Sequence, residues 1–429
     1  MDKSELQPAR YHFGDSIYMI KNETKENELQ HPLEGIRVLE IGLFHAGPGA
    51  GAILGDLGAE VIKIELPEGD PERYWTRLGQ LDLSLPGGEG AMFQASNRNK
   101  KGICLDINNP KGRKVFHRLI KTADVFLTNI RKSTKAKLGI DYAALSRVNP
   151  SMIHANVSGF GPEGPMSDLG AFDPLGLARS GMMFVSGTDE PLLMHIGILD
   201  QATSITMSHA IITALFVRER RGVGQEVHVS LFGTGQWLMH PTLMIGNILS
   251  IEPVVHHDRK KHSPLRNFFR CRDGEWIIGT HHPEEKYWSS FCEATRQSQL
   301  ISDPRYATLE ARAANSTKLV KYFDQVFAKK TRDEWMEIFL SRGLMFCSIQ
   351  HASEVKDDPQ ARANDYVVDF EDPTLGKIKI PGYPVHFSAC TAGTRTLAPK
   401  LGEHTASVLG ENGYAELEIE ALMAAGAIF

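Results

Sequence analysis

Residues 35–42 read Gly-Ile-Arg-Val-Leu-Glu-Ile-Gly, and we expect a turn in the glycine-rich segment that follows, Ala46-Gly-Pro-Gly-Ala-Gly51. A short apolar run bounded by glycines is typical of a buried parallel strand. We expect a helix after it, to about Leu57, and a second strand at Glu60-Val-Ile-Lys-Ile-Glu65. Strand, helix and strand in this order form a βαβ unit, which begins a doubly wound sheet.

The alternation of strand and helix continues along the first half of the chain. Helices are predicted at 110–121, 141–148 and 201–218, and strands at 124–128, 152–157 and 226–231. After about residue 255 short strands and helices are mixed. We therefore predict an α/β fold, with a Rossmann-like doubly wound large domain and a smaller α+β domain. The chain divides into an N-terminal extension (1–33), the first part of the large domain (34–235), a linker with the small domain (236–345) and a return segment that completes the large domain (346–429).

The composition is that of an ordinary globular protein. The 429 residues are 42% hydrophobic and 23% charged, and 47 basic residues against 52 acidic ones give a formal charge of −5. These values exclude disorder, collagen and coiled coil as descriptions of the whole chain. The acidic balance also argues against a nucleic-acid partner held by global charge.

The five cysteines form no CxxC pair, which indicates neither a disulfide framework nor a zinc module and suits a reducing compartment. The scattered histidines lack the spacing of metal ligands, so no metal site is predicted. The N-terminus has no apolar signal-peptide core, and no run approaches the roughly 18 apolar residues of a membrane span. We expect a soluble, cytoplasmic protein without a membrane partner.

The segment Gly47–Ala52 fits the pattern G-x-G-x-x-A between a predicted strand and a predicted helix, and Glu65 ends the next strand. This is the context of a dinucleotide fingerprint, with pyrophosphate at the helix N-terminus and the acid on a ribose. Pro48 removes one backbone donor, so we favour close packing of helix on strand as the role of these glycines. An NAD(P)-dependent dehydrogenase is the alternative.

Positive charge is concentrated between Asn97 and Lys137, where twelve basic residues and two acids give a net charge of +10. Such a field suits a small polyanion, for example a nucleotide with several phosphates. We interpret the basic residues of the helix at 110–121 as a solvated face. Ligands of open α/β sheets bind beside strand ends, so we expect the polyanion at two turns that carry Arg98, Lys100, Lys101 and Arg131 to Lys137.

Asp200 lies directly before the apolar helix, in Gly197-Ile-Leu-Asp200-Gln-Ala-Thr-Ser204. Two roles fit a carboxylate in this place. It can cap the helix through a side-chain oxygen, or it can act as a nucleophile that the helix N-terminus keeps ionised. The local pattern alone favours the N-cap.

Segments spread in order over nearly the whole chain resemble the family III CoA-transferases, the superfamily of formyl-CoA transferase, crotonobetainyl-CoA transferase and 2-methylacyl-CoA racemase. They are Leu33–Glu65, Gly69–Arg73, Asn97–Asp106, Pro110–Arg113, Leu138–Tyr142, Asn149-Pro150, Ser158-Gly-Phe-Gly161, Gly222–Gln225 and Leu401–Thr405. No single motif is decisive, but the ordered set is highly specific.

The resemblance implies two subunits, identical or related, threaded through each other as interlocked rings. It places the family's nucleophilic aspartate on Asp200, in preference to the N-cap, and an active-site residue on His45, so these two are the candidate catalytic residues. The residues expected to bind coenzyme A or acyl-CoA are His45, Ala46, Arg98, Lys100, Lys101, Leu105, Asp106, Asn129, Ile130, Arg131, Lys137, Phe172 and Asp173.

The activity that the resemblance implies is transfer of coenzyme A from an acyl-CoA donor to a small carboxylic acid, through an aspartyl-CoA thioester. Family racemases use a His–Asp pair, but Phe172 occupies the histidine position here. Gly170–Pro174 and Leu127–Asn129 are most similar to transferases for aryl or branched hydroxy acids or substituted succinates. The sequence also leaves open a 2-methylacyl-CoA racemase-like enzyme and a non-catalytic CoA-binding subunit.

Overall fold

A computed structural model describes residues 30–194 and 197–429, so most of the predicted N-terminal extension lies outside the described residues. Its largest element is a six-stranded sheet in which all neighbouring strands are parallel. In spatial order the strands are β5 (Lys100–Cys104), β2 (Glu60–Glu65), β1 (Arg37–Ile41), β6 (Val125–Thr128), β7 (Ile153–Ser158) and β8 (Gln225–Ser230). The chain winds outward in both directions from β1, which is the doubly wound arrangement. The prediction of an α/β fold is confirmed.

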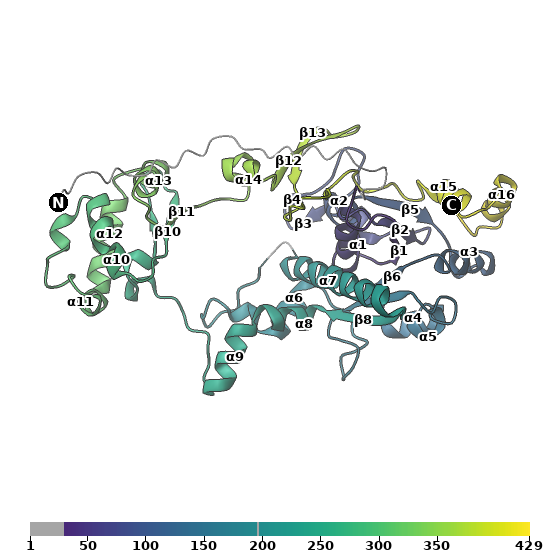
Figure 1. Ribbon diagram of the computed structural model, residues 1–429, viewed down its shortest axis with the longest axis horizontal. Coiled ribbons are helices and arrows are strands. Elements are labelled where there is room, and N and C mark those ends of the chain that lie inside the picture. The colour runs from purple at the N-terminus through teal and green to yellow at the C-terminus, as the bar shows by residue number, and fades with distance from the viewer. Residues whose placement is uncertain (1–29, 195–196) are drawn as a thin grey trace, which may run out of the picture.

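Helices cover both faces of this sheet (Figure 1). Consecutive strand residues point to opposite faces, and so Leu39 belongs to the core under α3, α15 and α16, whereas Val38 belongs to the core under α1, α6, α7 and α8. The helices of the large domain are α1 (Ala46–Asp56), α2 (Ala91–Asn97), α3 (Pro110–Ile120), α4 (Lys132–Leu138), α5 (Tyr142–Leu145), α6 (Asp173–Ser180), α7 (Ile198–Arg221), α8 (Leu231–Leu238), α15 (Thr405–Glu411) and α16 (Glu416–Ala424). A short hairpin, β3 (Arg77–Leu78) and β4 (Leu81–Asp82), follows β2.

The C-terminal segment returns to the large domain and covers the outer strand β5. The Cys104 N–H donates to Thr405 Oγ1 at 3.0 Å, and Leu105 forms a single antiparallel bridge with Ile428. Residues about three hundred positions apart in the chain therefore build one side of the sheet.

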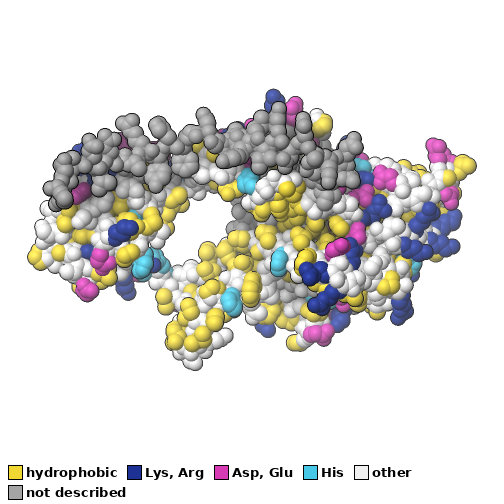
Figure 2. All heavy atoms as spheres, viewed as in Figure 1, with side chains coloured by type: hydrophobic (Ala, Val, Ile, Leu, Met, Phe, Trp, Pro, Cys, Tyr) yellow, Lys and Arg dark blue, Asp and Glu magenta, His cyan; other side chains and the backbone are white. Residues whose placement is uncertain are grey.

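A second, smaller domain is set apart from the sheet, and Figure 2 shows an opening between the two parts. Its core is rich in stacked aromatic rings, such as Phe269 on Phe327 at 4.2 Å between centroids. It contains an antiparallel sheet and four helices: β11 (Phe346–Ile349), β10 (Trp276–Gly279), β9 (Phe268–Arg270), α10 (Glu285–Ala294), α11 (Leu309–Ala314), α12 (Ser316–Phe327) and α13 (Arg332–Ser341). The connections carry α9 (His240–Leu249), α14 (Pro359–Ala363), β12 (Val367–Asp372) and β13 (Gly376–Pro381). No helix in the described ranges has the length and apolar character to span a membrane.

The glycine-rich segment is helical and not a turn, because α1 begins at Ala46 and is buried over its whole length. A Cβ on Gly49 would lie 2.4 Å from Ser204 Oγ of α7, and one on Gly51 would lie 2.0 Å from Glu40 Oε2 of β1. The glycines thus allow α1 to lie between α7 and the sheet. This agrees with the packing role that we favoured, while the prediction of a turn is wrong.

Gly51→Ala is expected to destabilise the protein by about 2–4 kcal/mol. The new methyl group displaces the Glu40 carboxylate, which holds the buried Lys100 ammonium at 2.8 Å. Urea denaturation of both proteins measures the difference.

The matched control is Gly410→Ala on α15, where the exposed Cβ would meet nothing within 4 Å. It is expected to raise stability by up to about 1 kcal/mol, since alanine favours helix. Equal effects of the two substitutions would contradict the packing role of Gly51.

Candidate active site

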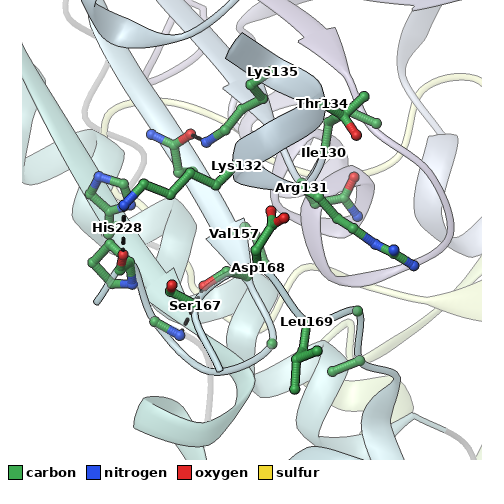
Figure 3. A pocket seen from close by; sticks show the side chains of 18 of the residues that line it. Ile130, Arg131, Lys132, Thr134, Lys135, Val157, Ser167, Asp168, Leu169 and His228 are labelled. Carbon is green, nitrogen blue, oxygen red and sulfur yellow. Dashed lines mark hydrogen bonds between the residues drawn. The ribbon is translucent and has the colours of Figure 1, made fainter. Parts of the chain in front are cut away.

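A cavity of about 980 Å³ lies where the strand order reverses, between the carboxyl ends of β1 and β6. Residues 43–46 after β1 and 129–131 after β6 line it. Asn129 joins these two segments, because its Nδ2 donates to the Leu43 carbonyl at 2.7 Å and its Oδ1 accepts from the Leu43 N–H at 2.9 Å. Ligands of doubly wound sheets bind at this reversal, which makes the cavity in Figure 3 the candidate active site.

Asp200 lies in this cavity as the third residue of α7. Gly197 holds the N-cap position, and Asp173 Oδ2 accepts hydrogen bonds from the N–H groups of Leu199 at 2.7 Å and Asp200 at 3.0 Å. The N-cap role for Asp200 is therefore wrong, since the helix is capped from α6. Within the described ranges no group donates a hydrogen bond to the Asp200 carboxylate, so both of its oxygens are available.

The surroundings of Asp200 disfavour its charge. Burial first, and then the negative charges of Asp173 and Glu72, raise the pKa of Asp200 to about 7. The N-terminus of α7 favours the ionised form. A carboxylate that lacks hydrogen-bond donors keeps its electron pairs basic, which suits a nucleophile.

His45, directly before α1, is held on both sides of its ring. Its Nδ1 lies 2.6 Å from Ser96 Oγ, and its Nε2 lies 2.8 Å from Gln201 Oε1. An amide oxygen only accepts hydrogen bonds, so in this arrangement Nε2 carries the proton and Nδ1 accepts from Ser96. Burial lowers the pKa of His45, and its hydrogen bond to Gln201 opposes that effect only in part. The imidazole is therefore neutral near pH 7 and presents an N–H group.

Cations from the predicted basic stretch line the cavity beside α4. Arg131 precedes this helix, and Lys132 and Lys135 lie on it (Figure 3). Lys135 is buried and donates to Asn156 Oδ1, whereas Arg131 and Lys132 are exposed at the rim. Lys137 is exposed and is not among the residues that line the cavity.

The structure does not bring the other predicted basic residues into the cavity. Lys100 and Lys101 begin β5 and so lie at the amino end of a strand, whereas ligands bind at carboxyl ends. The three charges are used in ion pairs within the fold: Arg98 with Asp56 at 2.5 Å, Lys100 with Glu40 at 2.8 Å, and Lys101 with Glu60 and Glu411 at 2.8 Å each.

Leu105 and Asp106 also lie away from the cavity. Leu105 is fully buried under the C-terminal segment, and Asp106 accepts a hydrogen bond from the Asn108 N–H at 2.9 Å. Both follow β5, the outermost strand on its side of the sheet, and two strands separate them from the reversal at β6.

Glu65 does not have the free carboxylate that a ribose would need. Its two oxygens accept from Arg73 Nε and Nη2 at 2.8 and 2.7 Å, and both side chains are buried. Together with the helical glycine segment, this pair makes the dehydrogenase interpretation wrong.

Aromatic and other apolar side chains form one wall of the cavity. Phe44 has a φ of 57°, a conformation that bulky residues rarely adopt, and its N–H donates to Asp70 Oδ1 at 3.1 Å. Its ring packs edge-on against Phe172 at 5.1 Å and Trp75 at 6.4 Å between centroids. Phe44 and Phe172 line the cavity with Leu169 and Leu175.

One group outside the cavity has the spacing of metal ligands, namely Glu275, His351 and Glu354. The Arg332 guanidinium pairs with both carboxylates, at 3.5 Å to Glu275 and 2.6 Å to Glu354. One cation thus already pairs with both carboxylates of this group, which is far in sequence from Asp200.

Sequence reasoning missed Ser96, Gln201 and Asn156. Ser96 and Gln201 are 51 and 156 residues from His45, so no local pattern joins the three. One feature of the sequence did indicate that Gln201 lies near the site: it directly follows Asp200, at the start of the same helix.

A cavity at the reversal of an open parallel sheet, with a carboxyl of raised pKa and a cationic rim, is typical of an enzyme site for an anionic ligand. The family model described as CoA-transferase family III matches residues 33–405. The chain belongs to this family, and the predicted enzyme class, a family III CoA-transferase, is confirmed.

Relatives with different named substrates are similar over nearly their whole length. The (R)-2-hydroxy-4-methylpentanoate CoA-transferase of Clostridioides difficile is 32% identical over 394 residues, which cover 90% of this chain and 97% of the relative. The succinyl-CoA:glutarate CoA-transferase of Mus musculus is 30% identical over 403 residues, with 92% and 90% covered. A CAIB/BAIF family protein from Brucella suis has a similar structure, with a TM-score of 0.81, 28% identity, and 90% and 100% covered.

Asp200→Asn is expected to raise the free energy of unfolding at pH 8 by roughly 1–3 kcal/mol. Folding raises the pKa of the Asp200 carboxyl from 3.8 to about 7. The folded wild-type protein therefore loses stability as the pH increases from 3.8 to about 7. The amide does not titrate, so the gain is present at pH 8 and small at pH 4. Denaturant unfolding at both pH values measures it.

Asp168→Asn serves as the control in the same cavity. The Ser133 N–H lowers the pKa of Asp168, and so its amide variant should be no more stable than the wild type at pH 8. A gain for Asp200→Asn that is as large at pH 4 as at pH 8 contradicts this account of its electrostatics.

Proposed function

We propose that this family III CoA-transferase uses Asp200 as a covalent nucleophile in moving coenzyme A from an acyl-CoA donor to a carboxylic acid. The observation that carries the proposal is the half-buried Asp200 carboxylate, which has no donor within the described ranges and lies in the cavity at the sheet reversal. Because Asp173 caps α7, the Asp200 oxygens are not needed for the helix.

Each step of the transfer exchanges one bond at a carbonyl carbon. An Asp200 oxygen attacks the thioester, forms a C–O bond and expels the CoA thiolate, which gives a mixed anhydride. The thiolate then attacks the aspartyl carbonyl, forms a C–S bond and releases the donor acid as its carboxylate. The acceptor carboxylate displaces the thiolate from this aspartyl thioester, and the thiolate attacks the acceptor carbonyl of the new anhydride, which frees Asp200. No proton is gained or lost.

Two kinds of donor support the oxyanions that form in these steps. His45 Nε2–H can turn from Gln201 to a developing oxyanion, since its ring is neutral and held by Ser96. The first turn of α1 has N–H groups without intrahelical acceptors. Pro48 has none and Gly49 donates to the His45 carbonyl, so Ala46 and Gly47 supply these donors.

Coenzyme A is proposed to bind between the sheet reversal and the cationic rim. The exposed Arg131 and Lys132 are placed for its phosphates, and Ala46, Asn129 and Ile130 line the way to Asp200. Phe172 lines the part of the cavity proposed for the acyl group of the thioester. Asp173 contributes indirectly, because it caps α7, the helix that carries Asp200. No contact with coenzyme A is proposed for the six predicted residues that do not line the cavity: Arg98, Lys100, Lys101, Leu105, Asp106 and Lys137.

The acceptor that suits the cavity is a monocarboxylic acid with an aryl or branched apolar group. Phe44, Phe172, Leu169 and Leu175 give the acyl side an apolar wall, which favours such a group by burial. The substrate in the name of the Clostridioides difficile relative is of this type.

Two copies of the chain are proposed to interlock, as the family resemblance implies. The support is an exposed apolar face on α8 and α9, where Trp237 is 70%, Ile248 is 68% and Leu249 is 60% exposed. Monomeric proteins rarely leave so large a continuous apolar patch in water. The opening between the two domains leaves room for a threaded chain (Figure 2).

Asp200→Ala is expected to lower CoA transfer at least about 10⁴-fold, because the nucleophile is lost. Binding of free CoA, followed by calorimetry, should change little. Hydroxylamine added during turnover should convert Asp200 of the wild type to a hydroxamate, which peptide mass spectrometry identifies. The control Asp168→Asn lies in the same cavity and should retain transfer; retained transfer in Asp200→Ala would refute the assignment.

Phe172→Ala is expected to lower kcat/KM about 10-fold for acceptors with an aryl or branched group, because the apolar wall is shortened. For acetate and glutarate the expected change is below about threefold. A panel of acceptors read by the mass of the acyl-CoA product measures both. A uniform loss over all acceptors would mean that Phe172 shapes the site and does not select the substrate.

A further inference from the structure

A group of buried charges lies directly beneath the active site. Its three cations are Lys63, Lys100 and Arg73, and its three buried paired acids are Glu40, Glu65 and Asp70. Arg73 also pairs with the partly exposed Glu89 at 3.6 Å. Lys100 contacts only acceptors: both Glu40 oxygens, the Pro48 carbonyl and Asn97 Oδ1, all at 2.8–2.9 Å. Lys63 likewise contacts the Gly42 carbonyl and Asp70 at 2.9 Å. Groups surrounded by acceptors must be donors. Burial lowers the pKa of Lys100 only to about 8, so near pH 7 all three cations are protonated and balance the three buried acids.

Glu72 is a fourth acid in this group. It lies in the 3₁₀ turn Pro71–Tyr74, its side chain is fully buried, and neither carboxyl oxygen has a hydrogen-bond partner in the described part of the chain. An ionised Glu72 would be a buried charge without a cation of its own, which is costly. The charge count therefore favours a proton on Glu72.

The groups that face Glu72 come from several elements. Burial and the charge of Asp70 raise the pKa of Glu72 to about 7, while Ser96 of α2, Lys63 of β2 and Lys100 of β5 lower it. Its charge also acts on Asp200 of α7. Glu72 is thus a buried acid between the ion pairs and the active site.

Ser96 connects this acid to His45. It lies on α2, which packs against the 3₁₀ turn that carries Glu72, and it affects the ionisation of that acid. Its hydroxyl is 2.6 Å from His45 Nδ1. A hydroxyl has one proton. The contact of Ser96 Oγ with the Met92 carbonyl is long, at 3.5 Å, so the strong acceptors for this proton are Glu72 and His45. A protonated Glu72 needs no hydrogen bond from Ser96, which leaves the Ser96 proton for Nδ1 and the imidazole proton on Nε2. An ionised Glu72 attracts the Ser96 proton, and Nδ1 must then carry the imidazole proton to bond the Ser96 oxygen.

We propose that Glu72 is a positioning residue, whose bound proton directs the chain Glu72–Ser96–His45 so that His45 presents Nε2–H to the active site. The proposal rests on the proposed donor role of His45 in CoA transfer. When Glu72 loses its proton to solvent, the proton on the imidazole moves through solvent from Nε2 to Nδ1, and the active site loses a donor.

The first test reads the His45 tautomer by NMR in the full-length protein labelled with ¹⁵N-histidine, with no substrate present. His45→Gln assigns the signal. In the wild type His45 should be the Nε2–H tautomer at pH 6 and shift toward Nδ1–H at pH 9. In Glu72→Gln, whose amide can donate to Ser96 but cannot titrate, it should stay Nε2–H at both. A tautomer that does not change with pH in the wild type, or that changes equally in Glu72→Gln, overturns the proposal.

The second test compares rates at which butyryl-CoA labels Asp200 in the wild type and in Glu72→Gln. Both rates rise with the ionisation of Asp200, and loss of the Glu72 charge eases that ionisation. Each rate is therefore divided by the ionised fraction of Asp200 in that protein, measured by NMR of ¹³C-labelled aspartate, and the ratio of the corrected rates isolates the effect of Glu72 on His45. The ratio of variant to wild type should rise about tenfold or more from pH 6 to pH 9, since one oxyanion donor is worth that much. A constant ratio overturns the proposal. If neither protein is labelled, the proposed function fails, and the NMR result still decides the role of Glu72.

Discussion

The Asp173 carboxylate accepts the N–H groups of Leu199 and Asp200, and the chemistry of the site depends on this cap. A helix N-terminus needs an acceptor. Because α6 supplies it, the acid inside the first turn of α7 keeps its own oxygens for other use. The cap also places one negative charge beside another, which helps to raise the pKa of Asp200 to about 7. Helix stability and nucleophile reactivity thus come from one contact between two neighbouring helices.

Beneath this contact, buried ion pairs bring α1 and the sheet together. Glu40, Lys63 and Lys100 come from three adjacent strands and point to the side covered by α1, where Lys100 reaches the Pro48 carbonyl. Such pairs add little net stability, since desolvation offsets their attraction. They do fix the position of α1, because the glycines of this helix leave room for the Glu40 and Ser204 side chains. Since His45 directly precedes α1, the helix in turn fixes the position of His45. The polar interior therefore acts as a support for the active site.

Much of the fold could be predicted, because short segments rich in Val and Ile, such as Glu60–Glu65, are typical of the buried strands of a parallel sheet. Asn129, Arg131 and Asp200, which line the cavity, were predicted from strand ends, helix starts and family resemblance. Lys100 and Lys101 were assigned to the ligand because charge density does not tell which end of a strand a residue occupies. The Ser96–His45–Gln201 contacts could not be predicted, since each joins residues distant in sequence through tertiary packing.

The central claim is that the acyl group passes through an anhydride with Asp200, and an oxygen-isotope experiment tests it most directly. Turnover is run with an acceptor acid whose carboxylate carries the heavy oxygen isotope, and the peptide that contains Asp200 is weighed. Attack of the acceptor on the aspartyl thioester leaves one of its oxygens on Asp200 when the anhydride is cleaved. The account predicts heavy oxygen in Asp200. Labelled acyl-CoA product together with an unlabelled Asp200 would contradict it.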